Sequence, residues 1–160
     1  MENREQRLRE VARIAAALEV QTGCPAQLLI AQWAVESDWG AKPAGHANYF
    51  GVKKADRHRK CCTVTTREVV NGRSVVQKIE FADYDSLEDS CRDYAWLITN
   101  GEPYRAAWER YRNGRDLNTL IAAVAQVYAT DPNYARLVAV IAGQTDVAQA
   151  IAEGRTEVAA

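Results

Sequence analysis

The stretch AQLLIAQWAVESDWG, from Ala26 to Gly40, decides the fold of this chain. Its first part, AQLLIAQWAVES, is apolar on almost every side of a helical wheel, which is typical of a helix at the centre of a domain. Gly23 ends the preceding segment, and Pro25 suits the first turn of a helix. The sequence therefore predicts a central buried helix that carries one carboxylate, Glu36, in its last turn.

Helical spacing of apolar residues continues on both sides of this stretch. Before it, apolar positions 8, 11, 12, 15 and 18 predict a helix from about Arg4 to Thr22. After it, we expect helices behind Ser86 up to Asn100, between Tyr104 and Asn113, from about Asp116 to Tyr128, and from Tyr134 through Ile141. Beyond Gly143 the apolar residues become sparse, which predicts only a weak C-terminal helix or tail over residues 145–160.

Between these helices lies the signature of a β-hairpin. Two strand-like runs, TVTTREVV and SVVQKIEF, flank Asn71-Gly72, a dipeptide typical of a tight turn. A two-residue turn places Glu68 opposite Val75 and Val70 opposite Arg73. The sequence thus predicts an α+β, mostly helical fold with an α-lobe and a small β-hairpin lobe at about residues 61–84. Residues 1–144 form one domain.

Composition and charge exclude several classes of protein. With 160 residues, 48% hydrophobic and 26% charged, the chain has the balance of one globular domain. Its formal net charge of -1 gives no overall electrostatic attraction for nucleic acid or an anionic membrane. No run approaches the roughly 18 apolar residues of a membrane helix, and the charged start MENREQRLRE lacks the apolar core of a secretory signal. We expect a monomer with no nucleic-acid partner and no membrane insertion.

Basic residues are concentrated in the loop before the hairpin, at Lys53, Lys54, Arg57, Arg59 and Lys60, with His58 among them. Such a run is either a solvated loop or a patch that holds a polyanionic polymer near the active face. The sequence leaves both interpretations open.

The four cysteines show no metal-ligand spacing. Cys61 and Cys62 are adjacent rather than spaced as C-x-x-C, and no histidine pair completes a zinc site. Cys91 falls on the apolar stripe of a predicted helix, where a thiol acts as a small hydrophobe. We expect no metal, and inert thiols at these positions and at Cys24.

Glu36 is the first candidate for chemistry. A glutamate at the end of an apolar helix is unfavourable unless it is exposed, paired or protonated. The negative end of the helix and burial beside Trp33 and Trp39 both raise its pKa. A carboxylic acid that stays protonated near neutral pH is what protonates the leaving oxygen of a glycoside. The alternative is an exposed helix-end glutamate.

Glu68 is the second candidate. Strict alternation along the strands places it on the more apolar face of the hairpin, with Val64, Val70, Val75, Ile79 and Phe81. One carboxylate on an apolar face is either a cleft residue or the sign of a bulge that turns it to solvent. Glycoside cleavage ordinarily uses two carboxylates, although the acetamido oxygen of an N-acetylated sugar can replace the nucleophile. Glu68 would then orient or activate water.

Aromatic residues complete a site for a sugar polymer. Rings near helix ends and in loops can stack on sugar faces, and we expect Trp39, Tyr49, Phe50, Tyr128 and Tyr134 to do so. Trp33, Trp96 and Trp108 lie within predicted helices, and we expect them in the core.

Four motifs in order carry a family resemblance: AQWAVESDWG, NYFGVK, TVTTREVVNGR with FADYDSLEDS, and YATDPNYARLV. Together they resemble the N-acetylglucosaminidase domain of glycoside hydrolase family 73, found in flagellar peptidoglycan hydrolases and autolysins. The resemblance covers roughly Pro25 to Ile141. It implies a lysozyme-like fold with a substrate cleft between the lobes. It also implies cleavage of the β-1,4 bond after N-acetylglucosamine in cell-wall peptidoglycan, without a metal or organic cofactor.

The resemblance also implies roles for individual residues. The family's acid corresponds to Glu36, its hairpin base or nucleophile to Glu68, and its third catalytic candidate, which positions substrate, to Tyr128. Asn48 and Asp131, within the second and fourth motifs, join the aromatic residues as substrate-binding candidates. Asp38 departs from the small residue common after the motif's Glu-Ser, and a nearby carboxylate either raises the pKa of Glu36 or faces water.

Other functions remain as alternatives. A muramidase or lytic transglycosylase would cut the other glycosidic bond of the same polymer, and a transglycosylase needs only one acid. From another class, a peptidoglycan-binding or assembly module would keep the fold without catalysis. We expect action at the cell wall, periplasmic or extracellular. Without a signal peptide in the sequence, delivery by another route, release by lysis and loss of a leader are all open.

Overall fold

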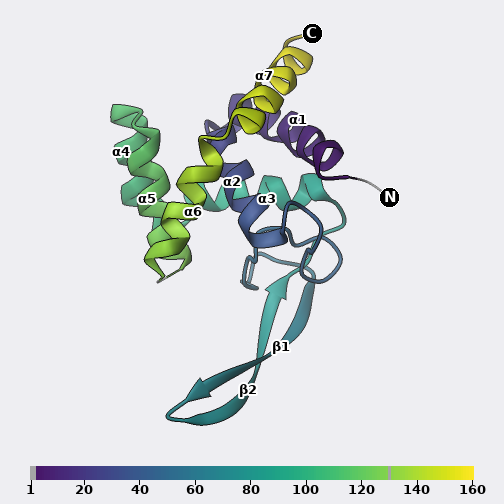
Figure 1. Cartoon of the computed structure of the whole chain (residues 1–160), viewed down its shortest axis with the longest axis vertical. Helices are drawn as coiled ribbons and strands as arrows, with labels where there is room; N and C mark the ends of the chain where they lie inside the picture. Colours follow the sequence, from purple (N-terminus) through teal and green to yellow (C-terminus); the bar gives the residue numbers. More distant parts are fainter. Residues whose placement is uncertain (1–2, 130) are drawn as a thin grey trace.

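The computed structural model describes residues 3–129 and 131–160, with the side chain of Glu68 excepted. A helical body carries a long β-hairpin that projects from one end (Figure 1). The helices are α1 Arg4–Thr22, α2 Ala26–Ser37, α3 Leu87–Asn100, α4 Arg105–Gly114, α5 Leu117–Tyr128, α6 Pro132–Ala142 and α7 Thr145–Ala159. A 3-10 turn, Glu102–Tyr104, precedes α4, and the strands are β1 Cys61–Val70 and β2 Arg73–Ala82. The predicted α+β, mostly helical fold with a hairpin lobe is confirmed.

Helix α2 forms the centre of the body, as its apolar sequence predicts. Helices α1, α3, α6 and α7 all contact it. Leu28, Leu29, Ile30 and Trp33 have no exposed surface. Each such side chain contributes about 1.5–3 kcal/mol through removal from water. The domain is therefore organised around the helix whose last turn carries Glu36.

Side-chain caps determine where several helices begin. Asn3 and Gln6 form a reciprocal capping box at the start of α1. The Ser86 hydroxyl accepts a hydrogen bond from the Asp89 amide, so the predicted start of α3 is confirmed. Asp116 accepts from the amide of Thr119 at the start of α5 in the same way. These bonds satisfy amides that have no partner within the helix.

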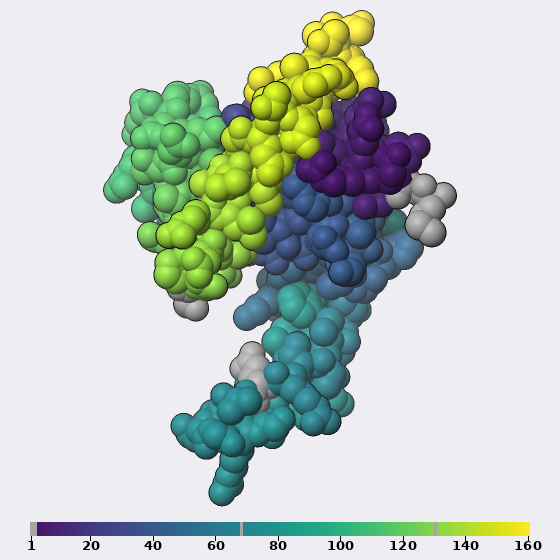
Figure 2. Space-filling model, in the orientation of Figure 1, coloured from purple at the N-terminus to yellow at the C-terminus, as the bar shows by residue number. Residues whose placement is uncertain are grey.

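The hairpin has the register that the sequence predicts. Its antiparallel ladder runs without a bulge from Cys61 opposite Ala82 to Val70 opposite Arg73. Asn71 and Gly72 have left-handed φ angles of 52° and 75°, as the tight turn requires. The tip stands clear of the body in the space-filling view (Figure 2), and Val69 is 76% exposed.

The base of the hairpin is joined to the loop before it by backbone hydrogen bonds. The Lys54 amide donates to the Glu80 carbonyl at 3.0 Å, and the Ala82 amide donates to the Val52 carbonyl at 2.9 Å. The loop at residues 52–54 thus continues the sheet on the side of β2, and its position depends on the hairpin base.

The C-terminal segment differs from the expectation of a weak helix or tail. Helix α7 is regular over 15 residues and packs along α1. Val147, Ala150, Ile151 and Gly154 are buried at helical spacing. Gly154 lies so close to α1 that a β-carbon there would be 2.8 Å from the Ala12 carbonyl oxygen. Small residues make this contact. Because they add little to the hydropathy of the segment, the sequence pattern predicted only a weak helix or tail.

One tryptophan also lies outside its expected place. Trp33 and Trp108 are buried as predicted, but Trp96 on α3 is 45% exposed. The guanidinium of Arg57 lies over its ring, 4.6 Å from the centroid. Within the described residues, no helix has the length and apolar character to cross a membrane.

Candidate active site

Glu36 lies in the last turn of α2, half-buried where the chain reverses direction. Three successive residues, Asp38, Trp39 and Gly40, have left-handed φ angles of 53°, 56° and 76°. The Ser37 hydroxyl supports this reversal, donating to the Trp33 carbonyl and accepting from the Gly40 amide. The sharp end of the helix leaves the Glu36 carboxyl at the surface of the core rather than within a continuing helix.

Burial raises the pKa of the Glu36 carboxyl above its usual value, and a hydrogen bond from Tyr134 opposes the shift in part. The net direction is upward because desolvation is the larger effect. The neighbouring Tyr104 has its pKa raised to about 12, first by its own burial and second by the negative charge of ionised Glu36. Glu36 therefore has the character of a carboxylic acid that can retain its proton, as the sequence predicts.

Asp38, the departure from the family motif, faces water. Its exposed carboxylate pairs with Lys42 at 2.8 Å, which lowers the pKa of Asp38. Of the two alternatives for Asp38, the exposed one therefore holds.

A one-directional chain of hydrogen bonds ends at Glu36. The buried Tyr94 hydroxyl donates to Oε1 of Gln32, and Nε2 of Gln32 donates to the Tyr134 hydroxyl oxygen at 3.0 Å. The Tyr134 hydroxyl then donates to Oε1 of Glu36 at 2.5 Å. Oε1 of Gln32 already accepts from Tyr94, and the Tyr134 hydroxyl oxygen already accepts from Gln32. The hydroxyl proton of Tyr134 is therefore directed to Glu36. The chain holds one carboxyl oxygen of Glu36 and leaves Oε2 for another partner.

The loop between α2 and the hairpin closes against Oε2. Gly51 has a φ angle of 63°, and a β-carbon on it would lie 3.1 Å from Oε2 of Glu36. Only glycine adopts this conformation without strain and also permits so close an approach. The backbone of Gly51 therefore forms one wall beside the free oxygen of the acid.

Asn48 shapes this loop from within. Its Nδ2 donates to the carbonyls of Val52 and Ala82 at 2.9 and 2.8 Å. Its Oδ1 accepts from the amides of Phe50 and Val52, both at 3.2 Å. The side chain is 1% exposed, and its full hydrogen-bonding capacity is used. Asn48 therefore has no group left for a ligand, contrary to the expected role in substrate binding, and instead determines the path of the loop past Gly51.

Tyrosine rings line the other side of Glu36. Tyr128 donates its hydroxyl to the Phe50 carbonyl at 2.8 Å, which joins α5 to the loop. Its ring is parallel to that of Tyr134, with centroids 6.3 Å apart, and 6.4 Å from that of Tyr104. Tyr128 and Tyr134, both predicted site residues, thus lie together beside Glu36.

A groove of about 420 Å³ extends from this point. Three of the residues that line it, Gly51, Tyr104 and Tyr128, lie near Glu36. The rest of the lining combines residues of the loop, Val52, Lys53, Lys54, Ala55 and Arg57, with the apolar residues Leu97, Pro103 and Val127. We refer to this feature as the basic groove. It is large enough for a small-molecule segment of a polymer.

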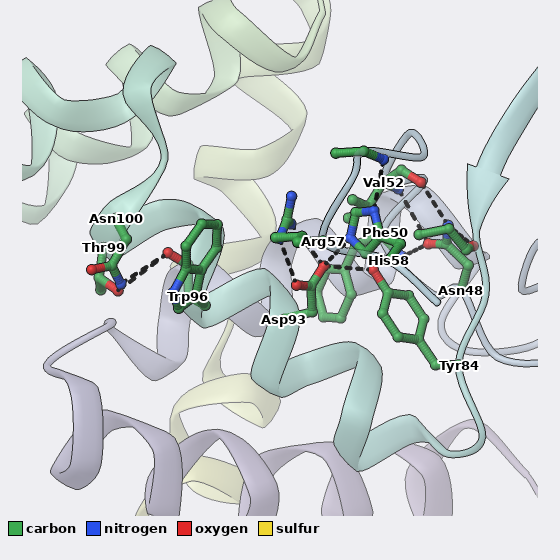
Figure 3. A network of polar contacts seen from close by, with 12 residues as sticks. Asn48, Phe50, Val52, Arg57, His58, Tyr84, Asp93, Trp96, Thr99 and Asn100 are labelled. Atoms are coloured by element: carbon green, nitrogen blue, oxygen red, sulfur yellow. Dashed lines mark hydrogen bonds and ion pairs between the residues drawn. The ribbon is translucent and has the colours of Figure 1, made fainter. Parts of the chain in front are cut away.

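The loop beside the basic groove is fastened to α3 through Asp93 (Figure 3). Arg57 makes two hydrogen bonds to this carboxylate, at 3.1 and 3.0 Å. Nε2 of His58 and the Tyr84 hydroxyl donate to it at 3.0 and 2.6 Å. Nδ1 of His58 accepts from the Ala55 amide, which leaves the ring proton on Nε2. Four hydrogen bonds to one carboxylate make this loop an ordered element.

The remaining substrate-binding candidates make other contacts in the structure. The ring of Trp39 packs against Trp33 and under Arg4, on the α1 side of the body. Phe50 is fully buried and stacked on Tyr94 at 4.3 Å, so its ring cannot meet a sugar. Tyr49 is half-buried, with its amide bonded to Ser90. Asp131 caps α6 through the Asn133 amide.

Glu68, the predicted second carboxylate, has a described backbone and a side chain outside the described part of the structure. The backbone pairs with Val75 in the middle of the outer half of the hairpin, as the two-residue turn predicts. Its assignment as base or nucleophile therefore stays a prediction.

Several residues around Glu36 did not emerge from the sequence. Gln32 lies four positions before Glu36, on the same face of a helix that is otherwise apolar, and this spacing was a signal that could have identified it. Tyr94, Tyr104 and Gly51 were likewise not among the residues expected at the site. Their relation to Glu36 depends on contacts between distant segments, which no local pattern contains.

Metal-binding and thiol groups contribute little to this region. The described residues hold no group of three or more His, Cys, Asp or Glu side chains suited to a metal ion. All four cysteines are free thiols, and Cys24 and Cys91 are buried. Burial raises the pKa of Cys24 to about 12, which keeps that thiol protonated.

Comparison with known sequences connects this geometry to a family. The family described as mannosyl-glycoprotein endo-beta-N-acetylglucosaminidase matches residues 12–146. Peptidoglycan hydrolase FlgJ of Pseudomonas aeruginosa is 33% identical over 141 residues, covering 84% of this chain and 35% of the relative. A probable N-acetylmuramidase of Lactococcus lactis is 30% identical, covering 79% of this chain and 30% of the relative. The chain spans about a third of the length of these relatives.

Solved structures show the same architecture. The glycoside hydrolase domain of Salmonella typhimurium FlgJ superimposes with a TM-score of 0.68 at 28% identity, covering 88% of this chain and 95% of that one. The catalytic domain of the autolysin Auto from Listeria monocytogenes shares the fold, with a TM-score of 0.76 at 24% identity and coverage of 94% and 89%.

Proposed function

Since the chain belongs to the glucosaminidase family of glycoside hydrolases, family 73, we propose that it hydrolyses the β-1,4 bond after N-acetylglucosamine in peptidoglycan. The observation that carries the proposal is the half-buried Glu36, which has a raised pKa and lies near Gly51, Tyr104 and Tyr128, residues that line the basic groove. Hydrolysis of a glycoside needs a protonated carboxyl group at the leaving oxygen.

Glu36 acts as the general acid through Oε2. Its Oε1 accepts from Tyr134, so the proton resides on the oxygen beside Gly51, toward the groove. When that proton passes to the glycosidic oxygen, the carboxylate left behind keeps the Tyr134 hydrogen bond. A hydrogen bond to an ionised acceptor is roughly twice as strong as a neutral one, so the bond strengthens as the reaction proceeds.

Tyr128 and Tyr134 position the substrate and the acid. The Tyr128 hydroxyl is engaged by the Phe50 carbonyl, so its contribution is the face of its ring and the placement of the Gly51 loop. Flat apolar ring faces beside an acid suit the faces of sugar rings. Asp131 caps α6 and so supports Tyr134, which lies three positions further along.

Glu68 is the proposed second carboxylate, acting as base or nucleophile from β1. Its strand belongs to the hairpin, which is joined to the rest of the body at its base. If the acetamido group of the substrate supplies the nucleophile, Glu68 orients or activates water instead. A Glu68→Gln variant separates these roles, since a nucleophile's loss abolishes turnover, whereas a wild-type rate favours acetamido assistance or another base.

Cleavage of the other glycosidic bond is the second candidate function. The Lactococcus relatives carry the name N-acetylmuramidase, and the geometry around Glu36 suits an acid for either bond. A binding module without catalysis is a third candidate of another class, and retention of the raised-pKa glutamate argues against it.

Digestion of purified peptidoglycan distinguishes these functions. Borohydride reduction followed by mass spectrometry of the fragments identifies the sugar at each new reducing end. We expect reduced N-acetylglucosamine ends, and at least about a 10²-fold loss of turnover in Glu36→Gln, the low end of general-acid contributions. Reduced muramic or anhydro-muramic ends would assign the other bond. Binding without fragments would assign a binding module.

Action on peptidoglycan places the protein at the cell wall, outside the cytoplasmic membrane. We propose that the domain acts there as a monomer, because the basic groove and Glu36 are formed by residues of one chain.

A further inference from the structure

We propose that the basic groove is a subsite for carboxylates on the muramoyl residues of peptidoglycan, with Lys53 and Lys54 as the cationic ligands. The inference rests on the proposed action on peptidoglycan and adds a recognition element to it. The lining of the groove includes Gly51, Tyr104 and Tyr128, which lie near Glu36, so a strand placed at Glu36 can extend into it.

Lys53 and Lys54 are unpaired cations that line the groove. Of the other cations in the loop, Arg57 is bonded to Asp93 and Lys60 to Asp85, and Arg59, which forms no ion pair among the described residues, is not part of the groove lining. In the part of the chain that the structure describes, Lys53 and Lys54 form no ion pair, and both are exposed. An incoming carboxylate therefore does not have to displace an internal partner.

The backbone holds both lysines in place at the rim of the groove. Lys53 forms a bridge to Phe81, and the Lys54 amide donates to the Glu80 carbonyl at 3.0 Å. On the other side of the lysines, the Asp93 cluster fastens Arg57 and His58 to α3. The segment is anchored at both ends, so less conformational entropy is lost when an anion binds than for a free loop.

The lining of the basic groove matches the two kinds of surface on a muramoyl residue. It includes the two lysines and the apolar residues Leu97, Pro103 and Val127. A sugar ring offers apolar faces, and a muramoyl residue adds a carboxylate, on its lactyl group or on the attached stem peptide. A neutral polymer of N-acetylglucosamine has no such charge. The groove thus gives a physical basis for preferring wall glycan over a neutral glycan.

Equilibrium binding tests the subsite without depending on turnover. Three soluble glycan strands are titrated into the Glu36→Gln protein: one with stem peptides, one stripped to its lactyl carboxylates, and one with all carboxyl groups amidated. We expect the Kd for peptide-bearing strands to be about threefold to tenfold lower than for amidated strands, the range of two exposed ion pairs. Stripped strands that bind like the first identify the lactyl group as the ligand. Stripped strands that bind like the amidated ones identify the stem peptide.

The double variant Lys53→Gln/Lys54→Gln, in the same background, should remove this preference and leave binding of amidated strands unchanged. Arg110→Gln/Arg112→Gln on α4 changes the net charge equally and should keep the preference. Equal Kd values for charged and amidated strands, or equal losses in the two double variants, would overturn the subsite. The reducing ends released by the wild-type protein test the proposed bond separately, so the two proposals can fail independently.

Discussion

The hydroxyl of Tyr134 lies 2.5 Å from Oε1 of Glu36 and joins the first turn of α6 to the last turn of α2. This bond favours the ionised form of Glu36, whereas burial favours the protonated form and is the stronger influence. The acid is thus held between two opposing effects, and each can be changed by one substitution.

Removal of the Tyr134 hydroxyl should move the pH dependence of the enzyme. In Tyr134→Phe the pKa of Glu36 rises further, because the bond that lowers it is gone. A general acid works only while protonated, so the alkaline limb of the kcat profile should move to higher pH. We also expect kcat to fall about tenfold through loss of positioning.

Tyr111→Phe on α4 is the matched control, since Tyr111 packs against Trp108 outside this region. The measurement is kcat against pH on soluble glycan strands. An alkaline limb that stays in place in Tyr134→Phe would show that this hydroxyl does not influence the acid.

The ionisation of Glu36 should also affect stability. Burial raises its pKa in the folded state, so the stability contributed by protonated Glu36 is present below the unfolded pKa and is lost as pH rises through the folded pKa. Glutamine does not ionise, so Glu36→Gln does not lose this stability as the pH rises. We expect Tm to rise by about 1–3 °C over wild type at pH 7–8, with little difference near pH 4.

Thermal unfolding followed by circular dichroism at both pH values gives the comparison. Glu109→Gln, an exposed substitution on α4, should leave Tm unchanged at each pH. If the gain in Tm of Glu36→Gln over wild type were no larger at pH 8 than at pH 4, that result would contradict a raised pKa of Glu36.

Gly51→Ala should reduce activity more than its backbone strain explains. The added β-carbon lies 3.1 Å from Oε2 of Glu36, the oxygen assigned to proton donation. We expect a loss of about 1–2 kcal/mol in stability from the left-handed φ angle, and a fall in kcat of about tenfold from displacement of the carboxyl.

Gly23→Ala is the control that separates the effect of backbone strain from the effect of close contact with Glu36. Its φ angle is 81°, and its β-carbon would meet Trp108 at an ordinary 3.5 Å. This control should lose similar stability and keep its turnover. Equal turnover in the two variants, measured on the same strands, would mean that the close approach to Glu36 has no catalytic consequence.

Gln32→Leu tests the buried hydrogen-bond chain behind Tyr134. The substitution keeps the approximate volume but leaves the Tyr94 hydroxyl without its acceptor. An unsatisfied buried hydroxyl costs about 1–3 kcal/mol in the free energy of unfolding. Adding Tyr94→Phe removes that hydroxyl, so the double variant should recover part of the stability.

Denaturant unfolding of the two single variants and the double variant gives the coupling between the residues. Additive losses would indicate that Gln32 and Tyr94 act independently. Rescue of stability without rescue of kcat would assign Gln32 a positioning role toward Tyr134.

The hairpin and the partial burial of Glu36 could be predicted because each depends on local pattern. Asn71-Gly72 specifies a two-residue turn, and the turn then determines the register up to Glu68. The apolar helix around Glu36 likewise determines its burial. Both predictions use residues within one or two elements.

The tyrosine wall and the inner role of Asn48 depend on segments far apart in the chain. Asn48 lies in a glycine-containing loop of a kind that often binds ligands, yet it bonds to Ala82 across the base of the hairpin. Trp96 was expected in the core as a tryptophan within a helix, but it lies off the buried stripe of α3, and Arg57 from a distant loop covers its ring. Such arrangements require tertiary contacts that override the local pattern.

The pairing of α7 with α1 brings the C-terminal end of the chain to the side of the molecule remote from the hairpin (Figure 1). The two helices run parallel, with ion pairs from Arg4 to Asp146 near their starts and from Arg155 to Glu19 near their ends. A tether, surface anchor or second domain fused at the C-terminal end would therefore start on the side opposite the hairpin. The domain could be immobilised on a bead through that end, or carried by another protein, with the hairpin still facing the solvent.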